Sequence, residues 1–140
     1  ADGSERQEKT RRSTAFLRSV NSFLNDNGKE LKFVRGFDLT VILPNGSSIG
    51  AENLSSGELQ LLTLFTFLYF RFDPDQEFAV FVDEPELSLH IAWQSRYIEN
   101  VMAANPNAQF IIATHSPEII GMFEDRTIEI SPRKTANAQI

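Results

Sequence analysis

Two short apolar runs, separated by a segment with helical spacing, constrain the fold of this chain more than any other feature. Residues 78–82 form the first run and residues 110–113 the second. Residues 88–104 lie between them and repeat apolar side chains as a helix does. The expected core residues of that helix are Ile91, Ile98, Val101 and Met102. The order strand, helix, strand predicts an α/β fold with a parallel sheet, whose apolar strands we expect to be buried on both faces.

The segments before this unit predict a helix, a hairpin and a second helix. Residues 13–25 place apolar side chains on one helical face. Residues 31–50 alternate as strands do around a turn at 44–47, which predicts a β-hairpin. Residues 59–70 are apolar around nearly the whole circumference of a helix, so we expect that helix to be buried on most sides.

The ends of the chain are polar. We expect residues 1–12 to be flexible or a linker, residues 13–130 to form one lobe, and residues 131–140 to be a polar tail. A last strand is predicted at 127–130. The first residues lack an initiator Met and the apolar core of a signal peptide, so we expect the chain to be a piece of a longer one.

Composition excludes several classes of protein. With 140 residues, 41% of them hydrophobic, the chain is long enough for one cored domain or lobe. Its net charge of −6 argues against a basic nucleic-acid footprint. The absence of cysteine excludes disulfides and thiolate metal sites and fits a reducing cytoplasm. No stretch reaches the roughly 18 apolar residues that a membrane span needs.

Polar side chains follow both predicted strands. Asp83 and Glu84 end the first apolar run, and His115 follows the second. Ligands of open α/β sheets bind beyond the carboxyl ends of strands, where a carboxylate can hold Mg²⁺ or accept a proton from water, and a histidine can donate to a phosphate oxygen. The alternatives are an acidic turn at the end of a strand and a purely structural histidine.

Residues 54–58, Leu-Ser-Ser-Gly-Glu, precede the apolar helix. Serine can cap a helix, glycine lets a phosphate approach, and a helix N-terminus favours an anion. The alternative is an ordinary capping box, in which Ser55 and Glu58 satisfy each other's backbone N–H groups.

Taken together, these motifs resemble those of the ABC ATPases, in the family's order, over roughly residues 31–130. Residues 54–58 resemble the signature motif and residues 78–85 the Walker B strand. Residues 87–90 stand where the D-loop falls, and residues 113–117 resemble the switch-histidine segment. The resemblance implies a partial ABC-ATPase lobe, which is P-loop NTPase-like, with a helix and a β-hairpin before its parallel sheet.

The resemblance also implies roles, with ATP and Mg²⁺ as cofactors. Asp83 would help hold Mg²⁺, Glu84 would polarise the hydrolytic water, and His115 would contact the γ-phosphate. The residues implied to reach a nucleotide held by a partner subunit are Ser55, Ser56, Gly57 and Glu58. Those implied at the dimer interface are Ser88 and His90.

The sequence departs from the family in four ways. The phosphate-binding pattern Gly-x4-Gly-Lys-Ser/Thr is missing, because the one Gly-Lys pair, at 28–29, has Phe23 and Glu30 at the other required positions. A Q-loop is missing too. Ser56 replaces the more usual Gly, and His90 replaces the common Asp of the D-loop. The chain thus resembles a C-terminal half that needs an N-terminal half carrying Walker A, and alone it should hydrolyse essentially no ATP.

Three details indicate a subfamily. Glu58, the run at 85–90 and the run at 114–117 resemble the SMC, RecF and double-strand-break-repair heads, and more closely still the OLD-type and Septu-type prokaryotic defence ATPases. This implies a cytoplasmic ATPase that dimerises around ATP in DNA maintenance or anti-phage defence, with DNA or a nuclease subunit as candidate partners and no membrane partner. The alternatives are a fragment of a transporter nucleotide-binding domain and a non-hydrolysing scaffold, which would need none of Asp83, Glu84 and His115.

Overall fold

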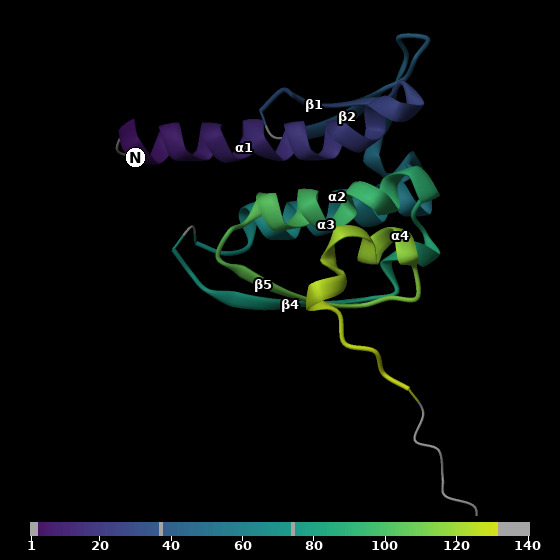
Figure 1. Cartoon of the computed structure of the whole chain (residues 1–140). Coiled ribbons are helices and arrows are strands. Elements are labelled where there is room, and N and C mark those ends of the chain that lie inside the picture. The colour runs from purple at the N-terminus through teal and green to yellow at the C-terminus, as the bar shows by residue number, and fades with distance from the viewer. Residues whose placement is uncertain (1–2, 37, 74, 132–140) are drawn as a thin grey trace, which may run out of the picture.

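The computed structural model describes residues 3–36, 38–73 and 75–131. A layer of helices lies between two small sheets (Figure 1). The helices are α1 (Gly3–Leu24), α2 (Ser56–Phe70), α3 (Ile91–Ala104) and the short α4 (Pro117–Ile120). The strands are β1 (Glu30–Val34), β2 (Asp38–Ile42), β3 (Ser48–Gly50), β4 (Phe78–Asp83) and β5 (Ala108–Ala113). Short 3-10 turns are η1 (Asn25–Asn27), η2 (Ala51–Asn53), η3 (Pro85–Leu87) and η4 (Gly121–Arg126).

The first helix is longer than predicted. It begins at Gly3, so residues 3–12, which were expected to be flexible or a linker, are helical. These turns face solvent and carry ion pairs at helical spacing, among them Lys9 with Glu5 at 2.7 Å. The buried stripe starts only at Phe16, which is why hydrophobic spacing alone placed the helix start too late. The expected tail at 131–140 lies, apart from Ser131, outside the described residues.

The predicted hairpin is a three-stranded antiparallel sheet in the order β1-β2-β3. Leu31 pairs with Val41, and both side chains are fully buried. The turn at 44–47 forms as expected, with Gly46 at φ +81°. The additional turn between β1 and β2 uses positive φ at Arg35 and Gly36. Phe37, a possible strand residue of the sequence, lies outside the described residues.

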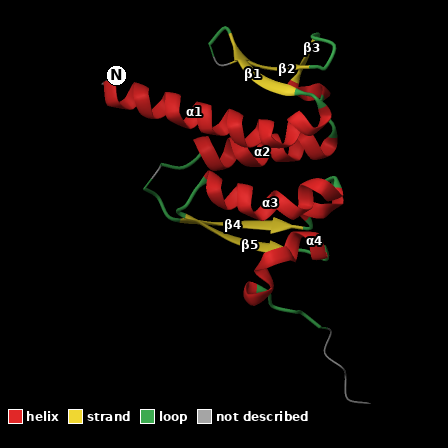
Figure 2. Ribbon diagram, turned by 45° about the horizontal axis from the view of Figure 1, so that its top comes forward, coloured by secondary structure: helices red, strands yellow, loops and turns green. Residues whose placement is uncertain are grey.

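The parallel pair β4–β5 confirms the predicted strand, helix, strand unit. The two strands run in register, with Val80 opposite Phe110 and Asp83 opposite Ala113. Alternate side chains of both strands pack toward the core that α2 and α3 share. Figure 2 shows both arrows ending on the side of α4, so the carboxyl ends of the strands meet there.

The expectation that these strands are buried on both faces is wrong for the described part of the chain. Figures 1 and 2 place the three long helices, α1, α2 and α3, on one side of the sheet. On the other side, Phe81 is 75% and Ile111 47% exposed, and these two residues are register partners. An apolar outer face therefore remains uncovered by the described residues.

Two helices bury a different set of side chains than predicted. In α2 the buried residues are Gly57, Glu58, Leu61, Leu62, Phe65 and Leu68. The opposite stripe, with Leu59, Phe67 and Phe70, is exposed, so the helix is not buried on most sides. In α3 the core positions are Trp93, Tyr97 and Val101. Ile91 and Met102, which were expected in the core, are exposed.

The last predicted strand does not form. Residues 127–130 are irregular, and no strand among the described residues pairs with them. Ile128 and Ile130 alternate as a strand would, but both side chains are almost fully exposed. Alternation alone cannot make a strand without a neighbour to accept its hydrogen bonds.

An aromatic cluster joins the three long helices. Phe23 of α1 lies 6.0 Å from Phe65 of α2 and 5.6 Å from Trp93 of α3, between ring centroids. Such pairs add to the burial of apolar area and fix the relative orientation of the helices. The cluster therefore packs α1 against the second half of α2 and against the first turn of α3.

Candidate functional site

Glu84 and His115 meet at the carboxyl ends of the parallel strands, as the sequence predicts. The backbone N–H of Glu84 donates to the carbonyl of Ala113 at 2.8 Å, which extends the pairing of the strands by one residue. Beyond that point Glu84 Oε1 lies 3.5 Å from His115 Nε2. The Glu84 side chain is 41% and the His115 side chain 89% exposed, so both groups can meet a ligand. Asp83 is exposed directly before Glu84.

The backbone of Glu84 is left-handed, with φ 44° and ψ 54°. Residues other than glycine seldom adopt this conformation, which costs on the order of 1–3 kcal/mol and concentrates at functional sites. Pro85 follows at the start of η3 and is buried. The sharp change of direction turns the chain out of β4 immediately after the acid pair.

Glu86 is a site residue that reasoning from the sequence did not single out. Its carboxylate accepts the backbone N–H of His115 at 2.6 Å and the hydroxyl of Thr114 at 2.8 Å. The pKa of Glu86 lies below its usual value. Burial is the largest single influence and acts to raise the pKa, but the hydrogen bonds that the carboxylate accepts, among them those from His115 and Thr114, together outweigh it. The available signal in the sequence was that Glu86 is the third carboxylate of the run Asp-Glu-Pro-Glu, close to the predicted site residues Asp83 and Glu84.

Gln94 of α3 is a second residue that was missed. Its Nε2 donates to the carbonyl of Leu89 at 3.0 Å, and its Oε1 accepts the hydroxyl of Ser116 at 2.6 Å. Ser116 also caps α4, where its oxygen accepts the N–H of Ile119. Gln94 thus links the loop after β4 to the loop after β5. The signal in the sequence was a polar residue directly beside Trp93, one of the core positions of α3.

Ser55 begins α2 with the capping box that was one of the two interpretations of this motif. Ser55 Oγ accepts the N–H of Glu58 at 3.4 Å, and Glu58 Oε2 accepts the N–H of Ser55 at 2.9 Å. Ser55 and Ser56 are nevertheless exposed at the tip of the helix. The cap therefore leaves both serines accessible.

Glu58, which the resemblance implies to reach a partner's nucleotide, is buried and paired within this chain. Its side chain is 1% exposed and pairs with Lys29 Nζ at 2.8 and 2.9 Å. Asn27 donates to the same carboxylate at 3.2 Å. Burial, the largest influence, would raise the pKa of Glu58, but the hydrogen bonds from Lys29, Ser55 and Asn27 together lower it. The carboxylate is fully used within the chain.

Gly57 has a structural reason to be glycine. It is buried, and a Cβ added to it would collide with the backbone carbonyl of Ser88. The signature segment and the segment at 87–90 are therefore in backbone contact. Close packing of this kind is sufficient to explain the missing side chain at position 57.

Ser88 and His90 are both exposed on the segment between η3 and α3. His90 is the N-cap of α3, and its Nδ1 accepts the N–H of Ala92 at 3.3 Å. Asp is among the preferred caps, and an imidazole nitrogen provides the acceptor here instead. The departure from Asp at this position thus keeps the helix start intact.

Asp83 is the candidate for a magnesium site. Among the described residues, no group of three or more His, Cys, Asp or Glu side chains could hold a metal ion by itself. Mg²⁺ usually keeps several waters and binds one or two carboxylates together with substrate phosphates. One exposed carboxylate beside a proposed phosphate position fits that chemistry.

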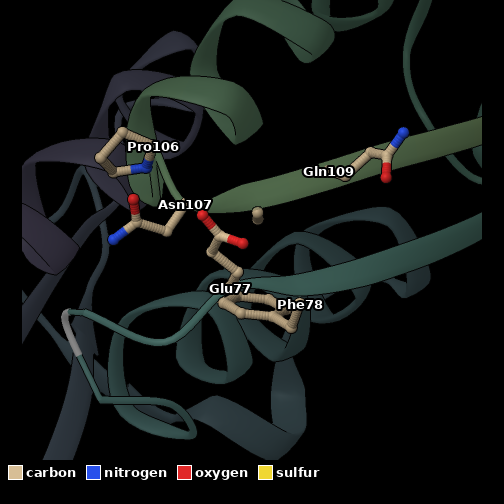
Figure 3. Close-up of a pocket in the computed structure, with 6 residues that line it drawn as sticks. Glu77, Phe78, Pro106, Asn107 and Gln109 are labelled. Carbon is tan, nitrogen blue, oxygen red and sulfur yellow. The ribbon is translucent and has the colours of Figure 1, made fainter.

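A hollow of about 470 Å³ lies at the opposite end of the parallel sheet (Figure 3). It is lined by Glu77, Phe78, Pro106, Asn107, Ala108 and Gln109, which flank the starts of β4 and β5. Ligands of α/β sheets bind at the carboxyl ends of strands. The candidate site is therefore assigned to Glu84 and His115 rather than to this hollow.

No helix in the described ranges has the length and apolar character to cross a bilayer.

Comparisons with known proteins identify a family and several relatives. Residues 7–121 match the family described as "AAA domain, putative AbiEii toxin, Type IV TA system". The chain is 31% identical over 136 residues to the "Retron Vc95 probable ATPase" of Vibrio cholerae serotype O1 biovar El Tor, covering 90% of this chain and 26% of that protein. It is 30% identical over 123 residues to the "Septu protein PtuA" of Bacillus thuringiensis, covering 74% and 31%. The chain thus spans about a quarter to a third of these relatives.

Solved structures agree on the fold. The crystal structure of the SmcHead bound to the C-winged helix domain of ScpA matches with a TM-score of 0.55 at 20% identity, over 78% of this chain and 35% of that chain. The SMC head domain from Thermotoga maritima matches with a TM-score of 0.50 at 21% identity, over 76% and 38%. The chain therefore belongs to the AAA family whose model it matches, as a partial ABC-type ATPase domain with a P-loop NTPase-like lobe, of the kind found in retron and Septu proteins.

Proposed function

We propose that this chain is the C-terminal part of an ABC-type ATPase that hydrolyses ATP to ADP and phosphate with Mg²⁺. The observation that carries the proposal is the approach of Glu84 and His115 to 3.5 Å at the ends of adjacent parallel strands. A carboxylate and an imidazole at this edge of a sheet suit the terminal phosphate of a nucleotide.

The chemistry assigned to these groups is positioning and charge stabilisation. Glu84 polarises the attacking water by accepting a proton from it. His115 donates a hydrogen bond to the γ-phosphate. Asp83 would hold Mg²⁺, and the ion would supply positive charge to the phosphates. The exposure of Glu84 and His115 supports these roles, because neither side chain is buried within the described residues.

The nucleotide itself requires a phosphate-binding loop that this chain lacks. We assign it to an N-terminal half carrying Walker A, which covers the outer face of the β4–β5 sheet. Phe81 and Ile111 support this assignment, because parallel sheets are normally covered on both faces, and here an apolar face is exposed. The relatives support it too, since the chain spans 26% of the first and 25% of the "Retron Ec83 probable ATPase" of Escherichia coli.

Two such heads close around ATP, as a homodimer or with another ABC subunit. Ser55 and Ser56 are exposed at the tip of α2, where a helix N-terminus favours a phosphate. The cap bond of Ser55 Oγ is long at 3.4 Å, so a phosphate oxygen can compete for this hydroxyl. Ser88 and His90, both exposed, lie at the same interface.

The named relatives support a biological setting. A retron ATPase and a Septu protein are among them, and the fold is that of an SMC head. We propose a cytoplasmic role in anti-phage defence or DNA maintenance, with DNA or a nuclease subunit as partner.

The decisive test compares the full-length protein with its Glu84→Gln variant. Phosphate release is measured with ATP and Mg²⁺, and dimerisation by size-exclusion chromatography. The variant should bind ATP, stay trapped as the ATP-bound dimer and turn over at least about 100-fold more slowly. Glu77→Gln, the same change at the far end of β4, is the matched control. Unchanged turnover in Glu84→Gln contradicts the role of Glu84, and an inactive natural protein contradicts the ATPase itself.

A further inference from the structure

The side chain of Glu86 joins the two loops that carry the candidate site. Glu86 lies in η3, after β4, and both of its carboxylate oxygens reach across to the loop after β5. Oε1 accepts the N–H of His115 at 2.6 Å, and Oε2 accepts the hydroxyl of Thr114 at 2.8 Å. One carboxylate therefore holds two consecutive residues, of which the second is the candidate catalytic histidine.

The residue on the other side of His115 is held as well. The N–H of Ser116 donates to Thr114 Oγ1 at 3.0 Å, and its hydroxyl donates to Gln94 Oε1 at 2.6 Å. Gln94 in turn donates to the carbonyl of Leu89, in the segment that follows η3. The backbone around His115 is thus anchored from both flanks to the loop after β4.

The imidazole itself has little packing to hold it. The His115 side chain is 89% exposed, and its approach to Glu84 is at 3.5 Å, beyond a short hydrogen bond. An exposed ring can rotate among its rotamers, so its reach depends on where the backbone places its Cβ. The anchor at the N–H of His115 fixes that starting point.

We propose that Glu86 is a positioning residue that holds the backbone of His115 so that the imidazole stays beside Glu84. This inference rests on the proposed function, in which Glu84 and His115 act on one ATP. Glu86 touches no reacting atom, and it acts only through His115. Its charge suits the task, since both neighbours are donors and each carboxylate oxygen serves one of them.

The closing experiment is a double-mutant cycle in the full-length protein. The variants are Glu86→Ala, His115→Ala and the combination, with Glu77→Gln as a control for loss of an exposed carboxylate. Steady-state phosphate release gives kcat and KM for each variant. A displaced catalytic group can cost on the order of 100-fold, so Glu86→Ala should lower kcat by about 100-fold with KM within about twofold. Glu86→Gln, which keeps one acceptor, should lose less, about 10-fold.

The combination of Glu86→Ala and His115→Ala decides between positioning and general stability. If Glu86 acts through His115, the double variant is no slower than His115→Ala alone, because the residue to be positioned is already gone. If the two losses multiply, the proposal is overturned.

A second readout separates this proposal from the ATPase assignment. The amide proton of His115 should resonate far downfield in the natural protein, as expected for a 2.6 Å bond to a carboxylate. The resonance should move upfield in Glu86→Ala and stay in place in Glu77→Gln. An unmoved resonance overturns the positioning role even if ATP is hydrolysed. A protein that shows the shift but hydrolyses no ATP keeps the anchor and refutes the proposed function.

Discussion

The backbone carbonyl of Ser88 occupies the space in which a side chain on Gly57 would stand. This places the tip of α2 directly against the segment that leads into α3. In the proposed dimer, both segments face the partner subunit. Because their backbones touch, a displacement of one is transmitted to the other without an intervening side chain.

Gly57→Ala should therefore destabilise the fold. The added methyl meets backbone rather than a flexible side chain, so α2 or the Ser88 segment must shift, at a cost of about 1–3 kcal/mol. Urea unfolding followed by circular dichroism measures the change. Gly3→Ala is the control, since open space surrounds Gly3 and alanine favours a helix. Equal stabilities of Gly57→Ala and the natural protein contradict the close contact.

Lys29→Met should destabilise the fold by about 3 kcal/mol, because it leaves the Glu58 carboxylate buried without its cation. The unfolding free energy in urea at pH 7 measures this. Lys9→Met is the matched control, since its pair with Glu5 is exposed and should leave the unfolding midpoint unchanged. A midpoint as high in Lys29→Met as in Lys9→Met shows that the buried pair contributes nothing.

Stability should also fall in acid, in part through Glu58. The pKa of this carboxyl is lower in the folded chain than its ordinary 4.5, so the folded state favours the charged form. The contribution is fully present above the unfolded pKa and is lost as the pH falls through the folded pKa. Urea midpoints from pH 7 to pH 3 test this. The acid loss should be smaller in Lys29→Met, in which the main donor is missing; an identical pH dependence there argues against Glu58 as its source.

Ser55→Arg should block ATP-driven dimerisation while leaving ATP binding intact. Ser55 is exposed, so the larger side chain fits the single head, at a cost of about 1 kcal/mol for the lost cap. In the proposed dimer, the added bulk and charge oppose closure around the partner's nucleotide. Light scattering with ATP measures the mass. Ser95→Arg, on the exposed face of α3, serves as the comparison. A normal ATP-bound dimer in Ser55→Arg removes α2 from the interface.

Tyr97→Phe should stabilise the fold by about 1 kcal/mol. The Tyr97 hydroxyl is buried and has no hydrogen-bond partner among the described residues, and burial raises its pKa. Removing an unsatisfied buried polar group relieves a desolvation cost. Tyr69→Phe should do the opposite, since the Tyr69 hydroxyl lies 2.7 Å from Ser19 Oγ. Thermal unfolding compares the two, and a loss of stability in Tyr97→Phe points to a hidden partner for that hydroxyl.

The meeting of Glu84 and His115 could be predicted from the sequence because it depends on topology. A helical crossover between two apolar strands favours a parallel pair, whose carboxyl ends meet at one edge. No such rule locates a third side chain. The hold of Glu86 on His115 depends on the left-handed turn at Glu84, which no periodicity encodes.

The role of Glu58 could not be predicted for a related reason. A capping box and a phosphate-binding helix tip use the same residue types, so the motif alone leaves both open. The burial of Glu58 depends on its ion pair with Lys29. Lys29 precedes Glu58 by 29 positions and lies between η1 and β1. Contacts of that range depend on packing, as does the exposure of Phe81, which hydrophobicity alone predicted to be buried.

The conformation of Glu84 sets stability and turnover against each other at a single position. Glycine adopts a left-handed backbone without steric strain, so Glu84→Gly relaxes the turn while it deletes the proposed base. Directed evolution that selects for heat resistance alone should then favour glycine at position 84. The resulting proteins should be more stable to heat and catalytically inactive. Selection that also requires turnover should retain Glu84 together with its left-handed backbone conformation.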